Sequence, residues 1–321
     1  KLVTNRAFSK YALCYGKSRG NRRKDGSMIK SVHYLRGLAA LIVVLFHFRY
    51  YLNDHYEQHQ QLGDALFANG AFGVDLFFII SGFIICYATE RTETKPLMSY
   101  VLKRVFRIYP LLVICLIAFY FLFDTGQTSL ARSLIPLHAD YTQPGPFFGY
   151  NMLSPVWTLT YEIFFYGLFF IGLSLSQPYR KSLTLLLLIS VFLGAQWYVN
   201  QGLTFSAHTQ FEYGGHPVTQ ALLALSSSPI LLEFAYGIGL YQVFKLLPAS
   251  SHLATRWLVP LSIMLFIGAA ITLFAPVLNA HGPLPWGLVA RLNLFSGLLY
   301  ERLKGLPALP GLYFLGNLYF S

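Results

Sequence analysis

The stretch Tyr34–Tyr51, YLRGLAALIVVLFHFRYY, decides the fold because it is apolar over nearly the length of a membrane-spanning helix. Arg36 stands near its start and His47 near its end, with ten uncharged residues between them. A helix turns about 100° per residue, so both side chains face one side of the helix, about 16 Å apart along its axis. Ionisable residues in a span usually face a bundle interior or a water-filled cavity. A snorkelling arginine with an interfacial histidine is the alternative interpretation.

The composition places the chain among membrane proteins. Its 321 residues are 55% hydrophobic and 12% charged, whereas a soluble domain carries about 25% charged residues. The three cysteines show neither a disulfide pattern nor a zinc spacing (Cys14, Cys86 and Cys115). Nine of the 24 Lys and Arg residues lie within the first 30 residues, and most others lie in short loops. The net charge of +11 therefore indicates membrane orientation and no nucleic-acid partner.

Two regions differ in composition. Residues 1–27 are basic and polar without the apolar centre of a signal peptide, so we expect a disordered cytoplasmic arm. Residues 28–321 form the transmembrane domain. Met28 directly precedes the first apolar run, and it is also a candidate start of the natural chain.

Alternation of charge along the chain predicts an all-α, polytopic membrane protein with its N-terminus in the cytoplasm. Lys and Arg residues cluster in every second link, and the opposite links contain a single basic residue, Arg132. This arrangement satisfies the positive-inside rule for nine spans. The apolar runs cover residues 33–53, 69–89, 108–123, 155–176, 182–199, 229–246, 257–276, 286–300 and 310–321.

The ninth run is about half as long as a span. We expect that the sequence lacks the rest of this helix and a tenth helix, although a re-entrant helix is the other interpretation.

Asp75 lies near the outer end of the second span, in GVDLFFIISGF. The first two spans run in opposite directions, so we expect Asp75 and His47 at a similar depth. A carboxylate beside an imidazole fixes its tautomer and raises its basicity, which suits a general base. An ion pair that only joins two helices is the alternative.

Basic residues gather in YVLKRVFRIYP, before the third span. Arg104 and Arg107 are three residues apart and so neighbours on one helical face, with Lys103 beside them. At the cytoplasmic surface, arginine forks bind phosphate oxygens bidentately. The segment therefore predicts a binding site for a phosphate-bearing molecule, and a simple positive-inside anchor is the alternative.

Further charges lie within later spans. Glu162 occurs in SPVWTLTYEIFFYG, with Tyr166 one turn further on the same face. Glu233 lies near the outer end of the sixth span, and Arg291 lies in the eighth. Such charges on separate helices predict a polar cavity or mutual pairing. Three residues of the outer link 124–154 are expected to be solvated: Arg132, His138 and Asp140.

Taken together, these segments resemble acyltransferase family 3, membrane proteins that O-acetylate bacterial surface sugars. The likeness covers Ile29 to the C-terminus and rests on five motifs in family order. These are the spaced Arg36–His47 pair, GVDLFFIISGF, KRVFRIYP, VWTLTYEIFFY around Glu162 and LLEFAYGIGL around Glu233. One departure is the ending FLGNLYFS, where family members continue into a further helix.

The resemblance implies a ten-helix enzyme of the bacterial inner membrane. Acyl-CoA, acetyl-CoA above all, would be the cytoplasmic donor substrate without any permanently bound cofactor or metal. A surface or lipid-linked carbohydrate would be the acceptor, and membrane lipid would surround the protein. The resemblance carries catalytic roles to Arg36 and His47, and donor handling to Arg104 and Arg107; Lys103 joins these two by position.

We therefore expect an O-acyltransferase in which Asp75 or Glu162 orients His47. His47 either removes a proton from the acceptor hydroxyl or first takes the acyl group itself. A transporter or flippase of a glycan or lipid-linked substrate is the alternative, because it would need the same basic residues at its cytoplasmic entrance and the same buried carboxylates. A non-catalytic membrane scaffold is the third possibility.

Overall fold

The computed structural model consists of helices joined by loops, and no strand occurs in the parts described. These are residues 28–53, 61–90, 95–123, 130–138, 140–208, 216–247, 252–273 and 280–318. The long helices are α2 (Lys30–Phe48), α4 (Phe72–Ala88), α5 (Pro96–Phe123), α7 (Val156–Leu175), α8 (Arg180–Asn200), α10 (Leu231–Leu246), α11 (His252–Thr272) and α12 (Trp286–Leu303). The shorter elements are η2 (Arg49–Leu52), α3 (Leu62–Phe67), η3 (Ala68–Ala71), α6 (Leu130–Ser133), α9 (Pro217–Ser227) and α13 (Pro310–Leu318).

Six helical segments of the described chain are long and apolar enough to cross a membrane. A seventh results if α9 and α10, which meet at an angle of 49°, form one broken span. The predicted helical class is therefore confirmed, whereas the count of nine spans is not. The predicted arm, residues 1–27, lies outside the described residues.

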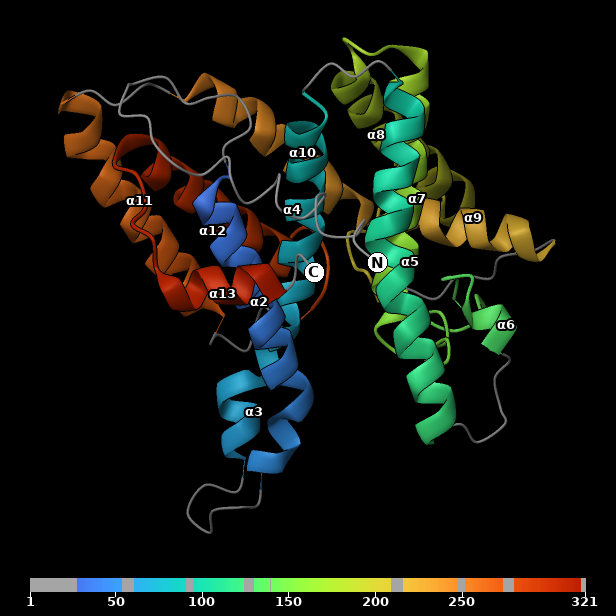
Figure 1. The fold of residues 1–321 in the computed structure, drawn as a ribbon. Coiled ribbons are helices and arrows are strands. Elements are labelled where there is room, and N and C mark those ends of the chain that lie inside the picture. The colour runs from blue at the N-terminus through green and yellow to red at the C-terminus, as the bar shows by residue number, and fades with distance from the viewer. Residues whose placement is uncertain are drawn as a thin grey trace, which may run out of the picture.

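Helix α4 occupies the centre of the molecule, where it contacts α2, α7, α10 and α12. Figure 1 shows α5 and α7 on one side of it and α11, α12 and α13 on the other. The closest neighbour is α10, and glycines at the crossing make this approach possible. A Cβ at Gly82 would collide with the carbonyl of Phe234, and one at Gly237 with the carbonyl of Ile79. Small residues at such crossings let membrane helices pack by van der Waals contact.

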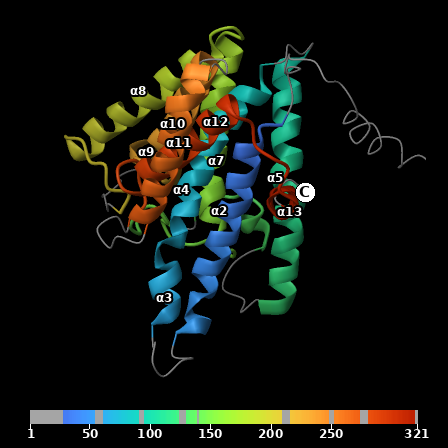
Figure 2. The same cartoon turned by 90° about the vertical axis from the view of Figure 1, so that its left-hand side faces the viewer.

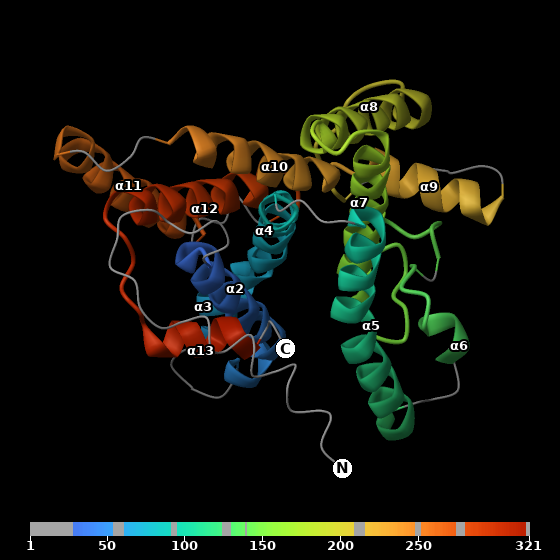
Figure 3. The ribbon, with the colours of Figure 1, turned by 45° about the horizontal axis from the view of Figure 1, so that its top comes forward.

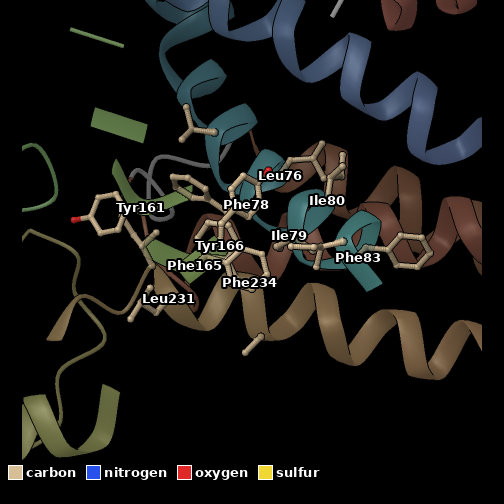
Figure 4. Packing of buried hydrophobic residues seen from close by; sticks show 14 of the residues in the cluster. Leu76, Phe78, Ile79, Ile80, Phe83, Tyr161, Phe165, Tyr166, Leu231 and Phe234 are labelled. Carbon is tan, nitrogen blue, oxygen red and sulfur yellow. The ribbon is translucent and has the colours of Figure 1, made fainter. Parts of the chain in front are cut away.

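Aromatic rings fill the space between α4, α7 and α10 (Figure 4). The Phe234 ring stacks on that of Phe165 at 4.3 Å between centroids and lies 5.0 Å from that of Phe78. Such packing holds polar side chains of these helices in fixed positions because interiors this dense resist rearrangement.

The C-terminal end of α2 packs against α3, and the two lie side by side at the bottom of Figures 1 and 2. Arg49 Nε donates to Asp64 Oδ1 at 2.7 Å. Further along the pair, a Cβ at Gly73 would lie 2.7 Å from the Ala39 carbonyl oxygen. These two contacts fix the antiparallel register of the first two spans.

The short helix α13 lies across α2, as Figures 1 and 3 show. Its Gly316 abuts the His33 ring, and its backbone reaches Gly37. The preceding segment is also tied to α2, because Tyr34 Oη donates to the Pro307 carbonyl at 3.0 Å. Glu301 at the end of α12 accepts the Ser31 N–H at 2.8 Å, which satisfies a donor at the start of α2.

The described part of the link before α7 is folded against the helices. Thr160 donates to the Pro136 carbonyl at 2.9 Å, and Tyr161 to the Pro146 carbonyl at 3.1 Å. His138 is buried among aromatic rings, which corrects the expectation that it is solvated. Arg132 is exposed and Asp140 is half-buried, and the Asp140 carboxylate accepts the Thr142 N–H at 2.9 Å.

Candidate active site

A polar cluster joins α4, α5 and α7 around the carboxylate of Glu162. Ser81 Oγ donates to Glu162 Oε1 at 3.2 Å, and Arg107 Nη2 lies 3.3 Å from the same oxygen. Tyr166, one turn further along α7, also donates to this carboxylate. The sequence predicted a polar cavity or mutual pairing among Glu162, Glu233 and Arg291, whereas the Glu162 carboxylate pairs with Arg107 on α5.

Arg107 lies between the two ends of helix α5, which begins before the predicted third span. The helix begins at Pro96 and continues through the predicted link, so Arg107 lies about 17 Å along a helix of 28 residues. Its side chain remains 32% exposed. A cation beside Glu162 neutralises the carboxylate, whose burial would otherwise disfavour its charge.

Arg104 lies one turn nearer the N-terminal end of α5 and contacts two tyrosines. Its Nη1 donates to Tyr166 Oη at 3.4 Å, and its guanidinium lies 5.0 Å from the Tyr166 ring centroid and 5.6 Å from that of Tyr100. Arg104 thus stands beside Arg107, as their spacing predicts.

A pocket of about 280 Å³ opens beside Arg104. Three cations lie in its wall, Lys103, Arg104 and Arg180, together with the ring of Tyr100. Its other lining residues are Ala88, Thr89, Glu90, Pro96, Leu173, Gln177 and Pro178. A concave surface with several cations and an aromatic ring suits a polyanion that carries a planar group.

Glu90 is the carboxylate of this pocket, and other cations already neutralise it. Lys245 Nζ donates to Glu90 Oε1 at 2.6 Å, and Lys181 Nζ donates at 3.2 Å. Burial raises the pKa of Glu90, but hydrogen bonds from Lys245, Tyr241 and Lys181 outweigh it and hold the pKa to about 2. Glu90 therefore stays ionised and paired at neutral pH.

The structure places Arg36 and His47 in different surroundings. Arg36 is buried, whereas His47 is exposed in the C-terminal half of α2. His47 Nδ1 lies 2.8 Å from the Val43 carbonyl oxygen, one turn back on the same helix. A carbonyl only accepts, so Nδ1 carries the proton and the lone pair is on Nε2. That tautomer leaves Nε2 as the basic and nucleophilic atom of His47.

Asp75 pairs with a histidine other than His47. Its Oδ2 lies 2.8 Å from His281 Nδ1, and its Oδ1 accepts the Gly282 N–H at 3.0 Å. Asp75 comes two residues after Gly73, so it is level with Ala39 and about 12 Å deeper than His47 along α2. The expected similar depth fails because α3 and η3 lengthen the second span outward, to Leu62.

Glu233 lies against the same carboxylate. It is fully buried in the first turn of α10, and its carboxyl approaches Asp75. Within the described residues, neither of its oxygens makes a hydrogen bond of ordinary geometry, nor does the neighbouring Trp286 Nε1. The first turns of α4, α10 and α12 thus meet at one point, where their N–H dipoles favour negative charge. Arg291 lies elsewhere on α12, over the Tyr236 ring at 4.7 Å.

Sequence reasoning missed His281 and Gly282. They are more than 200 positions from Asp75, and neither periodicity nor spacing relates residues so far apart. The only available signal was a histidine next to a glycine in an outer link. Across the described ranges, acidic, histidine and cysteine side chains form no group that could hold a metal ion.

Comparison with known families matches residues 29–315 to the acyltransferase domain of acyltransferase family 3. The matched segment contains Arg36, His47, Arg104, Arg107 and Glu162. No curated protein and no solved structure matches the chain.

Proposed function

Because this chain belongs to acyltransferase family 3, we propose that it is an O-acyltransferase that moves an acyl group, most simply acetyl, from cytoplasmic acyl-CoA to a carbohydrate hydroxyl. Membership of the family and several apolar helices make it a multi-pass membrane acyltransferase. The donor, the acceptor and the acetyl group are the parts that we propose. The acceptor is a surface or lipid-linked glycan.

The observation that carries the proposal is the basic pocket beside Tyr100. Acyl-CoA is a polyanion with a planar base, and it cannot enter the bilayer as a whole. We assign its phosphates to Lys103 and Arg104 and its thioester arm to the path toward Arg107 and Glu162. Lys103, Arg104 and Arg180 supply the charge that such phosphates need.

We propose Arg36 and His47 as catalytic residues, with Asp75 and Glu162 in supporting positions. His47 Nε2, which carries the lone pair, either accepts the acyl group or removes the acceptor proton. Arg36 is buried about 16 Å below, where a cation stabilises negative charge that develops on the donor.

The topology that we propose follows the charge alternation. The N-terminus lies in the cytoplasm of a bacterial cell, and the protein resides in the inner membrane. α12 and the short α13 add to the spans that length and composition alone identify. In this orientation the basic pocket opens toward cytoplasmic acyl-CoA and the outer links open toward the glycan.

The test uses labelled acetyl-CoA and membrane vesicles that contain the full chain and the host's surface glycans. Wild type should transfer label to glycan and release CoA, and Arg104→Ala should raise the acetyl-CoA concentration required. Arg132→Ala is the matched control because that arginine is exposed in an outer link. Glycan movement without acyl transfer would favour a transporter, and equal donor dependence of the two variants would remove Arg104 from donor binding.

A further inference from the structure

The His281–Asp75 pair has the internal geometry of a general base. Both Asp75 oxygens are occupied, one by His281 Nδ1 at 2.8 Å and the other by the Gly282 N–H at 3.0 Å. With Asp75 as acceptor, the His281 proton lies on Nδ1 and the lone pair on Nε2. Gly282 reaches this position with φ of +128°, a backbone conformation that favours glycine.

Aromatic rings surround the His281 imidazole. The rings of Trp286 and Trp157 lie 4.8 and 5.4 Å from it between centroids, and both stand edge-on to it. Asp75 is 1% exposed and His281 is 6% exposed. Flat apolar rings beside a carboxylate–imidazole pair suit a ligand with apolar C–H faces and hydroxyl groups, which describes a sugar.

Among the described residues, two further side chains lie beside the His281 ring. Exposed His208 and half-buried Phe147 lie 6.1 Å from the His281 ring, and 6.0 Å from each other. Both belong to the outer links before α7 and after α8. An acceptor that approaches from the side of His208 would meet these two loop side chains first.

Helix α4 also carries a residue of the donor cluster, on a face turned by about 120° from that of Asp75. Asp75 and Ser81 are six residues apart on α4, about 9 Å along its axis. Ser81 in turn contacts Glu162, so α4 connects the donor cluster to the His281–Asp75 pair.

We propose that His281 removes the proton from the acceptor hydroxyl, with Asp75 as its positioning residue. The inference rests on the proposed acyl transfer and names a second histidine for it. Trp157 and Trp286 hold the sugar ring, and the hydroxyl donates to His281 Nε2. His47, about 12 Å further out along α2, is then left with the acyl-accepting route or with contacts to the incoming glycan.

The step balances without any further reactant. The hydroxyl proton moves to His281 Nε2 while the hydroxyl oxygen forms a bond to the acyl carbon. The bond between that carbon and its carrier then breaks, and the carrier atom keeps the electron pair. His281 returns the proton to the carrier atom, so the base is regenerated.

The experiment compares His281→Gln with wild type in the full chain, using acetyl-CoA and the host's surface glycans. Glutamine keeps hydrogen-bonding groups but accepts no proton near neutral pH. Turnover should fall by about 10² to 10⁴, while acetyl-CoA binding and the melting temperature stay near wild type. His216→Gln is the matched control, an exposed histidine of the same link as His208.

A pH profile of the rate distinguishes a general base from an ion pair that only stabilises the fold. The titratable groups that face His281 are Asp75 on α4, Glu233 on α10 and His208 in the outer link. Asp75→Asn removes the charge that raises imidazole basicity, so the rising limb of the pH–rate profile should move to lower pH. If the pair only stabilises the fold, the midpoint of this rising limb should not change.

Two results overturn the proposal. In the first, wild type is active and His281→Gln is equally active. In the second, Asp75→Asn is active and the midpoint of its pH–rate profile is unchanged. If His281→Gln does not fold, the Asp75→Asn profile decides. A wild type that transfers no acyl group from acetyl-CoA instead refutes the proposed function itself, and acetyl-CoA binding by that protein makes the two failures distinguishable.

Discussion

At the scale of single residues, His47 is the residue on which the family resemblance places most weight. His47→Gln retains a polar side chain but loses the nitrogen lone pair that the local tautomer exposes. We expect loss of glycan acylation by a factor of about 10² or more, with acetyl-CoA binding intact. Glycan mass analysis on cells with matched protein levels measures this. Full acylation by the variant would exclude His47 from the chemistry.

Variants of the Arg107–Glu162 pair show whether Arg107 binds the donor or only stabilises the fold. Arg107→Ala removes a charge-assisted contact at 3.3 Å and leaves a carboxylate without its cation. We expect a loss of about 1.5–3 kcal/mol in stability or donor binding.

Its control is the double variant Arg107→Ala with Glu162→Gln. If the pair is only structural, the neutral amide that replaces the carboxylate should restore the melting temperature and donor binding together. If Arg107 contacts the donor, stability returns and donor binding does not. Full recovery of both in Arg107→Lys would reduce Arg107 to a generic positive charge.

The link before α7 should be sensitive to acid through His138. Burial lowers the pKa of this imidazole from 6.5 to about 3. The unfolded chain therefore binds a proton between these values that the folded chain does not, so stability falls as pH decreases from about 6.5 toward 3. Melting curves at pH 7 and pH 5 measure the change, and His138→Phe, which never charges, should show a smaller one. An equal loss in both proteins would contradict the assignment.

At the scale of elements, the contact between α4 and α10 depends on where glycine stands. A Cβ at Gly237 would meet the backbone of Ile79 and Phe83, whereas Gly239 on the same helix has nothing within 4 Å. Gly237→Ala should therefore destabilise the protein by about 1–3 kcal/mol. Gly239→Ala should be neutral or stabilising by up to about 1 kcal/mol, because alanine favours helix. Equal melting temperatures of the two variants would show that α4 and α10 do not meet this closely.

The second span shows how one element shifts a site. α3 and η3 extend it outward, and the Arg49–Asp64 contact sets its register against α2. Asp75 therefore lies at the level of Ala39, where α10 and α12 begin, and not at the level of His47 that the sequence predicted. The partner of a motif residue is thus determined by helix register, which hydropathy does not report.

At the scale of the whole molecule, the proposed orientation is open to direct labelling. Thr142 and Gln177 are both exposed and lie in links that the charge pattern assigns to opposite sides. In a background without native cysteines, Thr142→Cys should react with an impermeant reagent from outside, and Gln177→Cys only after the membrane is opened. Reaction of both from one side would reject the proposed topology.

Much was readable from the amino-acid sequence alone. Low charge and long apolar runs determined the membrane class and the helical secondary structure, because a bilayer requires backbone hydrogen bonds to be made internally. The spacing of Arg104 and Arg107 placed them on one face, and the motif order indicated the family that residues 29–315 match. These are local properties that a few consecutive residues decide.

Tertiary structure decided which charged groups meet. Glu162 pairs with Arg107, and Asp75 pairs with His281. His138 is buried, although its loop has a polar sequence. Tertiary structure also left His47 on an exposed stretch of α2, although its spacing from buried Arg36 places both on one face. The physical reason is that contacts between helices depend on register and close glycine crossings between distant segments, and sequence periodicity describes only one helix at a time.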